Sequence, residues 1–250
     1  MPDEGILIRI ENITVCYGDK IAVENVSFTF EAGFIYGIIG PNGAGKSSLI
    51  NTMVGILPIH AGRVHYDQDD LSKNSRNIRY NLGYAPENIY LYDYLTGREY
   101  LLMISEIKRL PETQDEIAYL LNQLNLQESA DRIIVSYSHG MRKKIALAAS
   151  LLGPPRYIIL DEALNGLDPV AMYNVRHLLR NYAKQGSTIL LSSHILELVE
   201  NWCDYIIIMK DARLLAAYSQ EDIERLCAKT GTDFSTHFIR LVAGDDQSSA

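Results

Sequence analysis

The residues best suited to chemistry form one short run, Gly40-Pro41-Asn42-Gly43-Ala44-Gly45-Lys46-Ser47. The run matches G-x-x-x-x-G-K-[ST], the phosphate-binding loop. Glycines let successive backbone N–H groups turn inward around an anion, because no Cβ blocks the approach. Lys46 can reach the outer phosphates, and the hydroxyl of Ser47, which Ser48 follows, can ligate the Mg²⁺ that accompanies them. A glycine-rich turn that only caps a helix would not need the full eight-residue match.

A second candidate element is an apolar strand that ends in two acids. YIIL (157–160) precedes Asp161 and Glu162, about 115 residues after the phosphate loop. Asp161 at the strand end can hold the magnesium, directly or through water. Glu162 can orient or deprotonate a water that is aimed at the γ-phosphate. Together the two elements predict a site for a nucleoside triphosphate.

The surrounding pattern predicts how these residues are positioned. FIYGII (34–39) is typical of a buried strand and residues 47–54 of a helix, so the glycines lie between a strand and a helix N-terminus, where the helix dipole favours an anion. Residues 6–36 alternate like antiparallel strands with turns at 18–20 and 31–33. GRVHYD and RYNLGYA, within residues 62–85, also indicate strands.

Residues 88–150 change character and predict an inserted helical subdomain. Thr96 and Glu99 form a capping box, a new helix follows Pro111, and a third begins near His139. From residue 156, strands alternate with helices, and a hairpin spans 205–217. The predicted fold class is α/β, with a mainly parallel sheet, an antiparallel β subdomain and the inserted α-helical subdomain. A short helix, QEDIERLC, and a polar end, GDDQSSA, close the chain.

Composition limits the classes of function. A net charge of -8 and a pI of about 5.3 argue against a general nucleic-acid binder. The three cysteines are far apart, which is typical of reduced thiols in a cytosolic protein. The first residues, MPDEGILIRI, are too briefly apolar for a signal peptide, and no apolar run approaches 18 residues. We therefore expect a cytoplasmic protein whose membrane role, if any, goes through a partner.

Three further strings carry a resemblance to a known family. SYSHGM (136–141) precedes the Asp-Glu strand, NGLDP (165–169) follows it, and SSH (192–194) ends a later strand. With the phosphate loop, they resemble the signature loop, D-loop and switch histidine of the nucleotide-binding domain of an ABC transporter. The resemblance covers about residues 6–240. It implies one ATPase domain over 1–240, a polar tail over 241–250, and ATP and Mg²⁺ as cofactors.

The resemblance assigns roles that the residues alone leave open. Tyr17 stands where the family places the aromatic that stacks on adenine, a contact worth roughly 1–3 kcal/mol, but it could also be a tyrosine on a strand face. The resemblance implies that His194 takes part in hydrolysis beside Glu162, although a lone histidine is more often a helix-capping or core residue. Ser138 and Gly140 are implied to face the γ-phosphate of ATP held by another subunit. Ser138 is equally a candidate N-cap.

Departures from the family pattern narrow the resemblance to one subfamily. LGYAPEN places Glu87 where the family usually has glutamine, and His139 and Met141 replace a glycine and the glutamine of the signature loop. Such substitutions are common in the ATPase subunits of ABC-2-type exporters, and this chain resembles those subunits. Glu87 is implied to contact Mg²⁺ or its water, as an anion rather than an amide.

The resemblance implies an ATP-hydrolysing subunit that dimerises around two ATP molecules, because Ser138 cannot easily reach the phosphate loop of its own chain. Its partners would be a second copy or a paralogue and an integral membrane permease, which would hold it at the inner face of the membrane for export. The apolar and aromatic residues of 89–94 suit contact with the permease, or equally the core of the insertion.

Two other classes of function remain open from the sequence. The first is a non-transport ABC ATPase that acts on nucleic acid or ribosomes. The absence of a long coiled-coil or zinc insertion and of a second ATPase domain disfavours it, and no nucleic-acid partner is expected. The second is a non-catalytic regulator, which the presence of Lys46, Asp161, Glu162 and His194 disfavours. Membrane co-purification and ATPase turnover would separate these classes.

Overall fold

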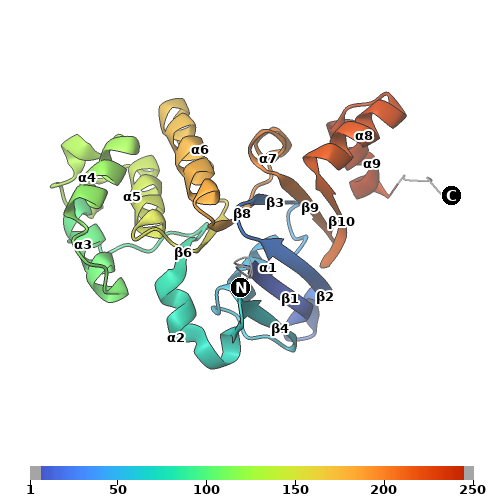
Figure 1. The fold of residues 1–250 in the computed structure, drawn as a ribbon, viewed down its shortest axis with the longest axis horizontal. Helices are drawn as coiled ribbons and strands as arrows, with labels where there is room; N and C mark the ends of the chain where they lie inside the picture. The colour runs from blue at the N-terminus through green and yellow to red at the C-terminus, as the bar shows by residue number, and fades with distance from the viewer. Residues whose placement is uncertain (1–6, 245–250) are drawn as a thin grey trace, which may run out of the picture.

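Two sheets and a group of helices make up the protein in the computed structural model, which describes residues 7–244. Figure 1 shows the helices of the insertion at the left, an antiparallel sheet below the centre, and a second sheet that runs above it across the middle of the molecule. Residues 1–6 and 245–250, which hold the start of MPDEGILIRI and most of the predicted polar tail, lie outside the described residues.

The antiparallel sheet is built from the alternating segments near the N-terminus. In pairing order its strands are β2 (Lys20–Glu31), β1 (Leu7–Tyr17), β4 (Ala61–Tyr66) and β5 (Asp69–Asp70). Along β1, the side chains of Ile8, Ile10, Ile13 and Val15 are fully buried, while Arg9 is exposed. This alternation is what a sheet with one face on a core requires.

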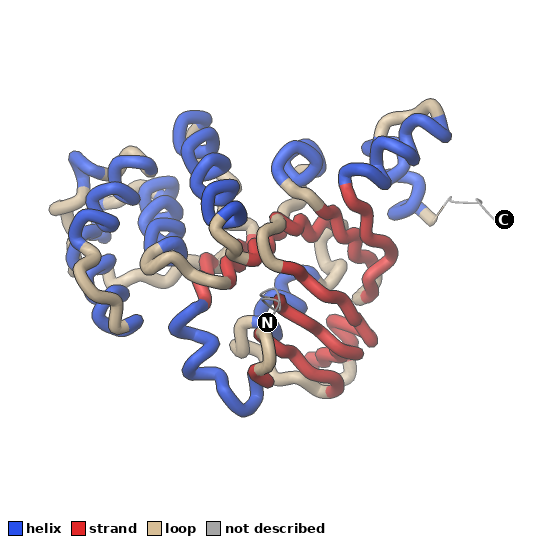
Figure 2. The backbone as a smooth tube through the Cα atoms, viewed as in Figure 1, coloured by secondary structure: helices blue, strands red, loops and turns tan. Residues whose placement is uncertain are grey.

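The second sheet is mainly parallel, as predicted. In order its strands are β10 (Arg213–Ser219), β9 (Tyr205–Lys210), β3 (Ile35–Ile39), β8 (Thr188–Ser192), β7 (Tyr157–Asp161) and β6 (Leu82–Ala85). Only β10 runs antiparallel to its neighbour. Every residue of β3, β7 and β8 is buried, which explains why these strands are continuously apolar. Figure 2 shows the strands at the centre and lower right, with helices mainly to the left of them and above them.

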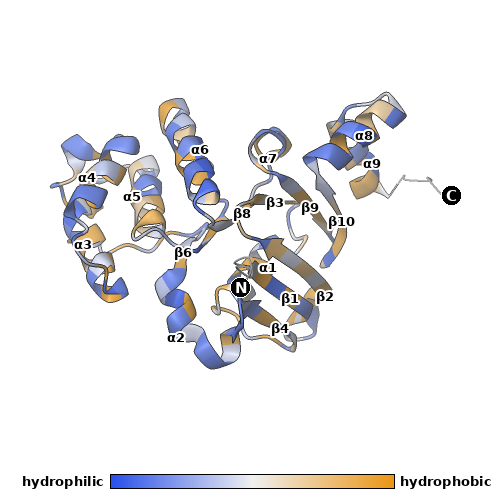
Figure 3. Cartoon of the chain, in the orientation of Figure 1, coloured by the Kyte–Doolittle hydropathy of each residue, from blue (hydrophilic) through white to orange (hydrophobic). Residues whose placement is uncertain are grey.

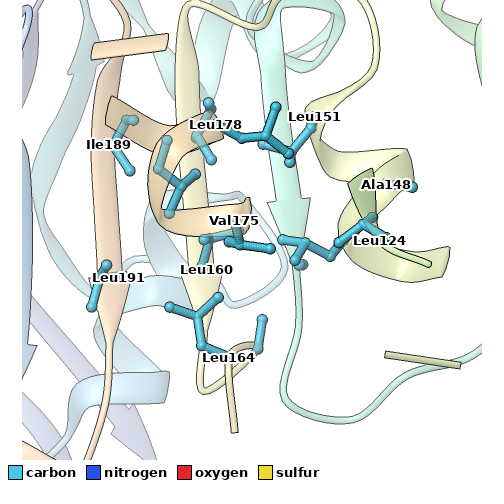
Figure 4. Packing of buried hydrophobic residues seen from close by; sticks show 14 of the residues in the cluster. Leu124, Ala148, Leu151, Leu160, Leu164, Val175, Leu178, Ile189 and Leu191 are labelled. Atoms are coloured by element: carbon cyan, nitrogen blue, oxygen red, sulfur yellow. The ribbon is translucent and has the colours of Figure 1, made fainter. Parts of the chain in front are cut away.

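Two hydrophobic cores lie on opposite faces of the parallel sheet. On β8, Leu190 packs with the antiparallel sheet, whereas Ile189 and Leu191 pack with the helices of the other face. Figure 4 shows Leu160, Val175 and Leu178 meeting in this second core. The parallel strands are therefore held rigidly from both sides, which is needed to fix the residues at their ends.

The helices follow the predicted positions with two additions. Their bounds are α1 (Lys46–Met53), α2 (Leu71–Asn81), α3 (Gly97–Lys108), α4 (Gln114–Gln123), α5 (His139–Leu151), α6 (Pro169–Lys184), α7 (Leu196–Trp202), α8 (Gln220–Thr230) and α9 (Phe234–Ala243), with short 3₁₀ turns at Gln127–Ser129 and Ile134–Ser136. Hydrophilic and hydrophobic residues are interspersed along α3 to α6 (Figure 3), as expected for helices with one buried face.

Three local predictions were wrong. RYNLGYA is not one strand, because residues 79–81 belong to α2, whose N-cap Asp70 accepts from Ser72 N and whose Ile78 is buried. Helix α9 was missed, and it continues past residue 240. The turn at 31–33 does not join a hairpin, because β3 leaves the antiparallel sheet and pairs in parallel with β8 and β9.

The hairpin over 205–217 is confirmed. Its two-residue turn has positive φ at both Asp211 (47°) and Ala212 (66°), which matches the twist of the strands that it joins. The backbone of Ala212 also pairs with two other segments, because its N–H donates to Ala44 O and its carbonyl accepts from Glu24 N. The turn therefore braces the phosphate loop.

Candidate functional site

The candidate residues meet at the carboxyl ends of three adjacent parallel strands. Lys46 and Ser47 follow β3, Asp161 ends β7 and Glu162 follows it, and His194 comes two residues after β8. The order β3-β8-β7 and the pairing of Asp161 with Ser192 place these strand ends side by side. Ligands of open α/β sheets bind at this edge, so the topology explains how residues far apart in the chain converge.

The loop between β3 and α1 is shaped for close approach of backbone. A Cβ on Gly40 would lie 2.1 Å from Met209 O, and one on Gly45 would lie 2.3 Å from Ala22 O. Gly45 also has a φ of 102°, in the left-handed region, and it is the N-cap of α1 without a side-chain cap. The first N–H groups of α1 are thus left to bind an anion.

Lys46 is buried and is held inside the loop. Its Nζ donates to Gly40 O at 2.7 Å and to Pro41 O at 3.2 Å. Burial lowers the pKa of the ammonium, while the nearby carboxylates of Glu162, Asp161 and Glu87 oppose this shift. The lysine therefore faces a surplus of negative charge, while its hydrogen bonds within residues 7–244 go to two carbonyls.

Asp161 is the centre of a network of hydroxyl groups. Ser192 Oγ donates to Asp161 Oδ1 at 2.6 Å, and Ser47 Oγ donates to the same oxygen at 3.1 Å. Burial raises the pKa of Asp161, the two hydroxyl groups counteract this, and the charges of Glu87 and Glu162 raise it further. The network joins the phosphate loop to two strand ends.

The donor set fits a hard cation that shares its ligands with a phosphate chain. The hydroxyl of Ser47 and the carboxylate of Asp161 are oxygen ligands in contact with each other, and the crowded carboxylates would be relieved by positive charge. Among residues 7–244, no group of three or more His, Cys, Asp or Glu side chains could hold a metal alone. Mg²⁺ is usually bound by one or two carboxylates plus substrate phosphates, which agrees with this set.

Glu162 and His194 form a pair at the edge of the site. His194 Nδ1 lies 3.0 Å from Glu162 Oε2, and the histidine side chain is 57% exposed against 11% for the glutamate. The backbone N–H of Glu162 donates to Ser192 Oγ at 3.0 Å. A third side chain, Asn165, also donates to Glu162 Oε2. Sequence reasoning gave no separate role to Asn165 or Ser192, although both stand in the strings that carry the resemblance.

Most of the predicted site residues line one open cleft of about 580 Å³. Its lining is Tyr17, Lys20, Ile21, Ala22, Asn42, Gly43, Ala44, Gly45, Lys46, Ser47, Ser48, Glu87 and Glu162. Tyr17 is 52% exposed at its rim, so its ring is not part of a core. Lys20, which the motifs did not single out, lies on the turn beside Tyr17. The lining therefore combines the phosphate loop with an exposed aromatic ring.

The predicted residues that lie outside that lining are Gly40, Pro41, Ser138, Gly140, Asp161 and His194. Ser138 is exposed and caps α5, where its Oγ accepts from Met141 N at 3.3 Å, so its N-cap role is confirmed. Gly140 is in the first turn of α5. Two lysines of this helix reach the loop after Glu162: Lys143 Nζ donates to Asn165 O at 2.7 Å, and Lys144 pairs with Asp168 at 2.5 Å.

Comparison with known proteins shows the family to which the chain belongs. Residues 23–165, more than half of the chain, match the family model described as ABC transporter. The chain belongs to the ABC transporter family. It carries the ATP-binding cassette of that family, whose members are ATPases that drive transport.

Two relatives and two solved structures illustrate the similarity. The cassette is 31% identical to the linearmycin resistance ATP-binding protein LnrL of Bacillus subtilis over 91% of this chain and 73% of that protein. It is 33% identical to the Nod factor export ATP-binding protein I of Sinorhizobium fredii over 83% of this chain but only 61% of that protein.

Among structures, the ATP-binding subunit of an ABC transporter superimposes with a TM-score of 0.88 and 28% identity, over 94% of this chain and 99% of that one. A dimeric bacterial ABC transporter cassette shares the fold, with a TM-score of 0.77 and 23% identity over 85% and 98% of the two chains. Among residues 7–244 of this cassette, no helix has the length and apolar character to cross a membrane.

Proposed function

We propose that this cassette is the ATP-hydrolysing subunit of an exporter, that two cassettes close around two Mg-ATP, and that they drive a separate membrane permease. The observation that carries the proposal is the pairing of Glu162 and His194 at the end of a cleft that also holds Lys46 and Ser47. A base, a phosphate-binding loop and an acidic metal ligand are the parts that phosphoryl transfer to water needs.

In this proposal the phosphate chain lies over the loop and the N-terminus of α1. Lys46 exchanges its carbonyl partners for the outer phosphate oxygens. Its position inside the loop and its flexible side chain support this change. Tyr17 stacks on the base at the opposite end of the cleft. The site residues Gly40 to Ser48 then contact ATP mainly through backbone N–H groups.

Ser47 and Asp161 would hold the Mg²⁺, with Glu87 close enough to contact it or its water. The ion would neutralise charge on the β- and γ-phosphates. Glu162 accepts a proton from water as the water oxygen bonds to the γ-phosphorus, and the bond to the bridging oxygen breaks to release ADP. His194 holds the carboxylate of Glu162 during this step, as its contact with Oε2 supports.

A second cassette completes the site. Ser138 and Gly140 stand at an exposed helix N-terminus and do not line the cleft of their own chain, so they are free to face ATP on another subunit. The dimeric cassette of the same fold supports this arrangement by analogy. Either a second copy or a paralogue could supply the loop.

The permease would dock beside the helical insertion. Tyr90, Tyr92 and Tyr94 are exposed, at 90%, 64% and 88%, so they are not the core of the insertion. Leu91 instead packs against that core. A groove of about 390 Å³, lined in part by Ile104 and Lys108 of α3, also contains the apolar side chains of Val54, Ile56 and Leu82. Export, as the direction of transport, is supported by the Nod factor relative.

The test is ATP turnover by Glu162→Gln compared with the native protein. The amide keeps the shape of the side chain but cannot take a proton, so we expect a loss of about 10²–10⁴-fold in rate with ATP binding retained. Asn201→Ala is the control, because Asn201 is exposed on α7 and bonds within its own helix. Native turnover by Glu162→Gln would refute the proposed role of this residue.

A further inference from the structure

Asn165, the third residue after Glu162, places its side-chain amide between the two residues of the proposed catalytic pair. Its Nδ2 donates to Glu162 Oε2 and lies 3.4 Å from His194 Nδ1. His194 Nδ1 approaches the same Glu162 oxygen at 3.0 Å. Two nitrogen atoms from different loops therefore converge on one carboxylate oxygen, which fixes the rotation of the carboxylate more firmly than either contact alone.

The backbone of Glu162 has an unusual conformation that neighbouring residues must hold in place. Its φ is 51°, in the left-handed region, which a glutamate adopts only when its surroundings require it. The N–H of Glu162 is held by Ser192 Oγ, and its carbonyl accepts from Asn165 N at 3.3 Å. Asn165 is thus bonded to Glu162 through both its backbone and its side chain.

Asn165 is in turn held from the helix that begins beside Ser138. Lys143 Nζ donates to Asn165 O at 2.7 Å, and the neighbouring Lys144 pairs with Asp168. These two bonds hold the loop 162–168 against α5. A contiguous path of bonds therefore runs from α5 through Lys143 and Asn165 to the carboxylate of Glu162.

We propose that Asn165 is a positioning residue for ATP hydrolysis: with His194 it holds Oε2 of Glu162, so that Oε1 is presented to the water in the cleft, and Lys143 sets the place of Asn165. The inference rests on the proposed function, because it assumes that Glu162 is the base. It concerns a residue that touches the base rather than the nucleotide. The loss of Asn165 should consequently affect the rate of the chemical step and not the binding of ATP.

The test measures kcat and KM for ATP with two substitutions of Asn165. Asn165→Ala removes the amide, and Asn165→Asp keeps its shape but replaces the donor with a negative charge facing Glu162. We expect both to lower kcat by about tenfold or more, because small misplacements of catalytic groups carry penalties of up to about 10²-fold. KM should stay within about twofold of the native value, since ground-state binding is unchanged.

Lys143→Met provides an independent arm. It should lower kcat by a smaller factor, about threefold, and the double variant with Asn165→Ala should be no slower than Asn165→Ala alone, because both act through the same carboxylate. Losses that simply multiply would show that Lys143 does not act through Asn165. Asn201→Ala should match the native protein.

Glu162→Gln in the same assay separates the two proposals. If Glu162→Gln turns over normally, the proposed function of Glu162 fails, and the positioning role fails with it. If Glu162→Gln is slow while Asn165→Asp keeps native kcat, or if Asn165→Ala is faster than native, only the positioning role is overturned. Asn165 is half-buried, so the isosteric aspartate keeps the test valid even if the alanine variant does not fold.

Discussion

Lys46 illustrates how one side chain depends on the charges around it. The ammonium is buried, its pKa is lowered by that burial, and three carboxylates restore part of the preference for the charged form. A phosphate chain would add negative charge to the same cleft, so a cation between the acids and the phosphates is physically reasonable. At the scale of single residues, the site is therefore built from opposed charges that a nucleotide and its metal would balance.

Lys46→Ala should lose most of its affinity for ATP. The substitution removes the cation of the loop, and truncating one partner of a buried charge pair usually costs about 2–5 kcal/mol. We expect ATP affinity to fall by at least about 30-fold, at about 1.4 kcal/mol per tenfold change. Calorimetric titration with Mg-ATP measures this directly, and native affinity would show that the ammonium does not reach the phosphates.

Glu87→Gln should make ATP affinity less dependent on magnesium. Glu87 lines the cleft, and its charge is felt by Asp161 and Lys46. An amide still offers an oxygen to the metal, but it removes the repulsion between neighbouring acids that the metal must offset. ATP affinity should be measured across a magnesium titration for both proteins. Superimposable curves would mean that Glu87 points away from the metal when ATP is bound.

At the scale of elements, the ends of helices and strands do most of the positioning. Helix α1 presents uncapped N–H groups to the cleft, whereas α5 is capped by Ser138 and is tied to the loop after β7 by Lys143 and Lys144. Between α6 and α4 of the insertion, the amide of Asn174 donates to Gln123 O. The insertion also shares a hydrophobic core with the parallel sheet, so it is packed against the elements that carry the site.

Lys108, at the end of α3, provides a test of packing in the insertion. Burial lowers its pKa to about 8, and Glu116 opposes the shift, while Nζ donates to Leu152 O at 3.1 Å. Between pH 8 and about 10.4, the folded protein has lost this proton and the unfolded chain retains it. The unfolded state then binds more protons, so stability rises with pH across this window.

We therefore expect the native free energy of unfolding to increase relative to Lys108→Met between pH 8 and 10, by about 1–3 kcal/mol. Denaturant unfolding of both proteins at several pH values measures the difference, and other titrating groups cancel in the comparison. A difference that is independent of pH would show that Lys108 keeps its charge in the folded state.

At the scale of the whole molecule, the signature loop (136–141) does not line the cleft of its own chain. The cleft of one chain lacks Ser138 and Gly140 in its lining, and three exposed tyrosines lie near the insertion. In the proposed dimer, an ATP molecule bound to one cassette would lack part of its contacts until a second subunit arrives, so nucleotide binding would be linked to assembly.

Glu162→Gln should accumulate as a dimer in the presence of ATP and magnesium. Because it binds ATP but hydrolyses it slowly, the ATP-bridged state would persist instead of dissociating after turnover. Gel filtration with and without nucleotide gives the oligomeric state, and Lys46→Ala is the matched control because its affinity for ATP should be much lower. A monomer under all conditions would mean either that the ATP-bridged dimer does not form with this chain or that its partner is a different subunit.

The sequence by itself determined the local parts of this protein. The glycine-rich loop, the acids that end the apolar strand and the Thr96–Glu99 capping box depend on neighbours within a few residues, so their spacing was enough to predict them. The family and the α/β class followed from the same strings and are confirmed. Roles of individual site residues stay predictions that the variants above test.

Tertiary structure decided what depends on residues far apart in the chain. That β3 leaves the antiparallel sheet follows from pairing with β8 and β9, and residues 79–81 are helical because α2 buries Ile78 as a helix. The convergence of Asn165 and His194 on one oxygen of Glu162 needs two loops to meet across adjacent strands. Such contacts depend on strand order and packing, because side chains 32 positions apart in sequence carry no local signal of their neighbour.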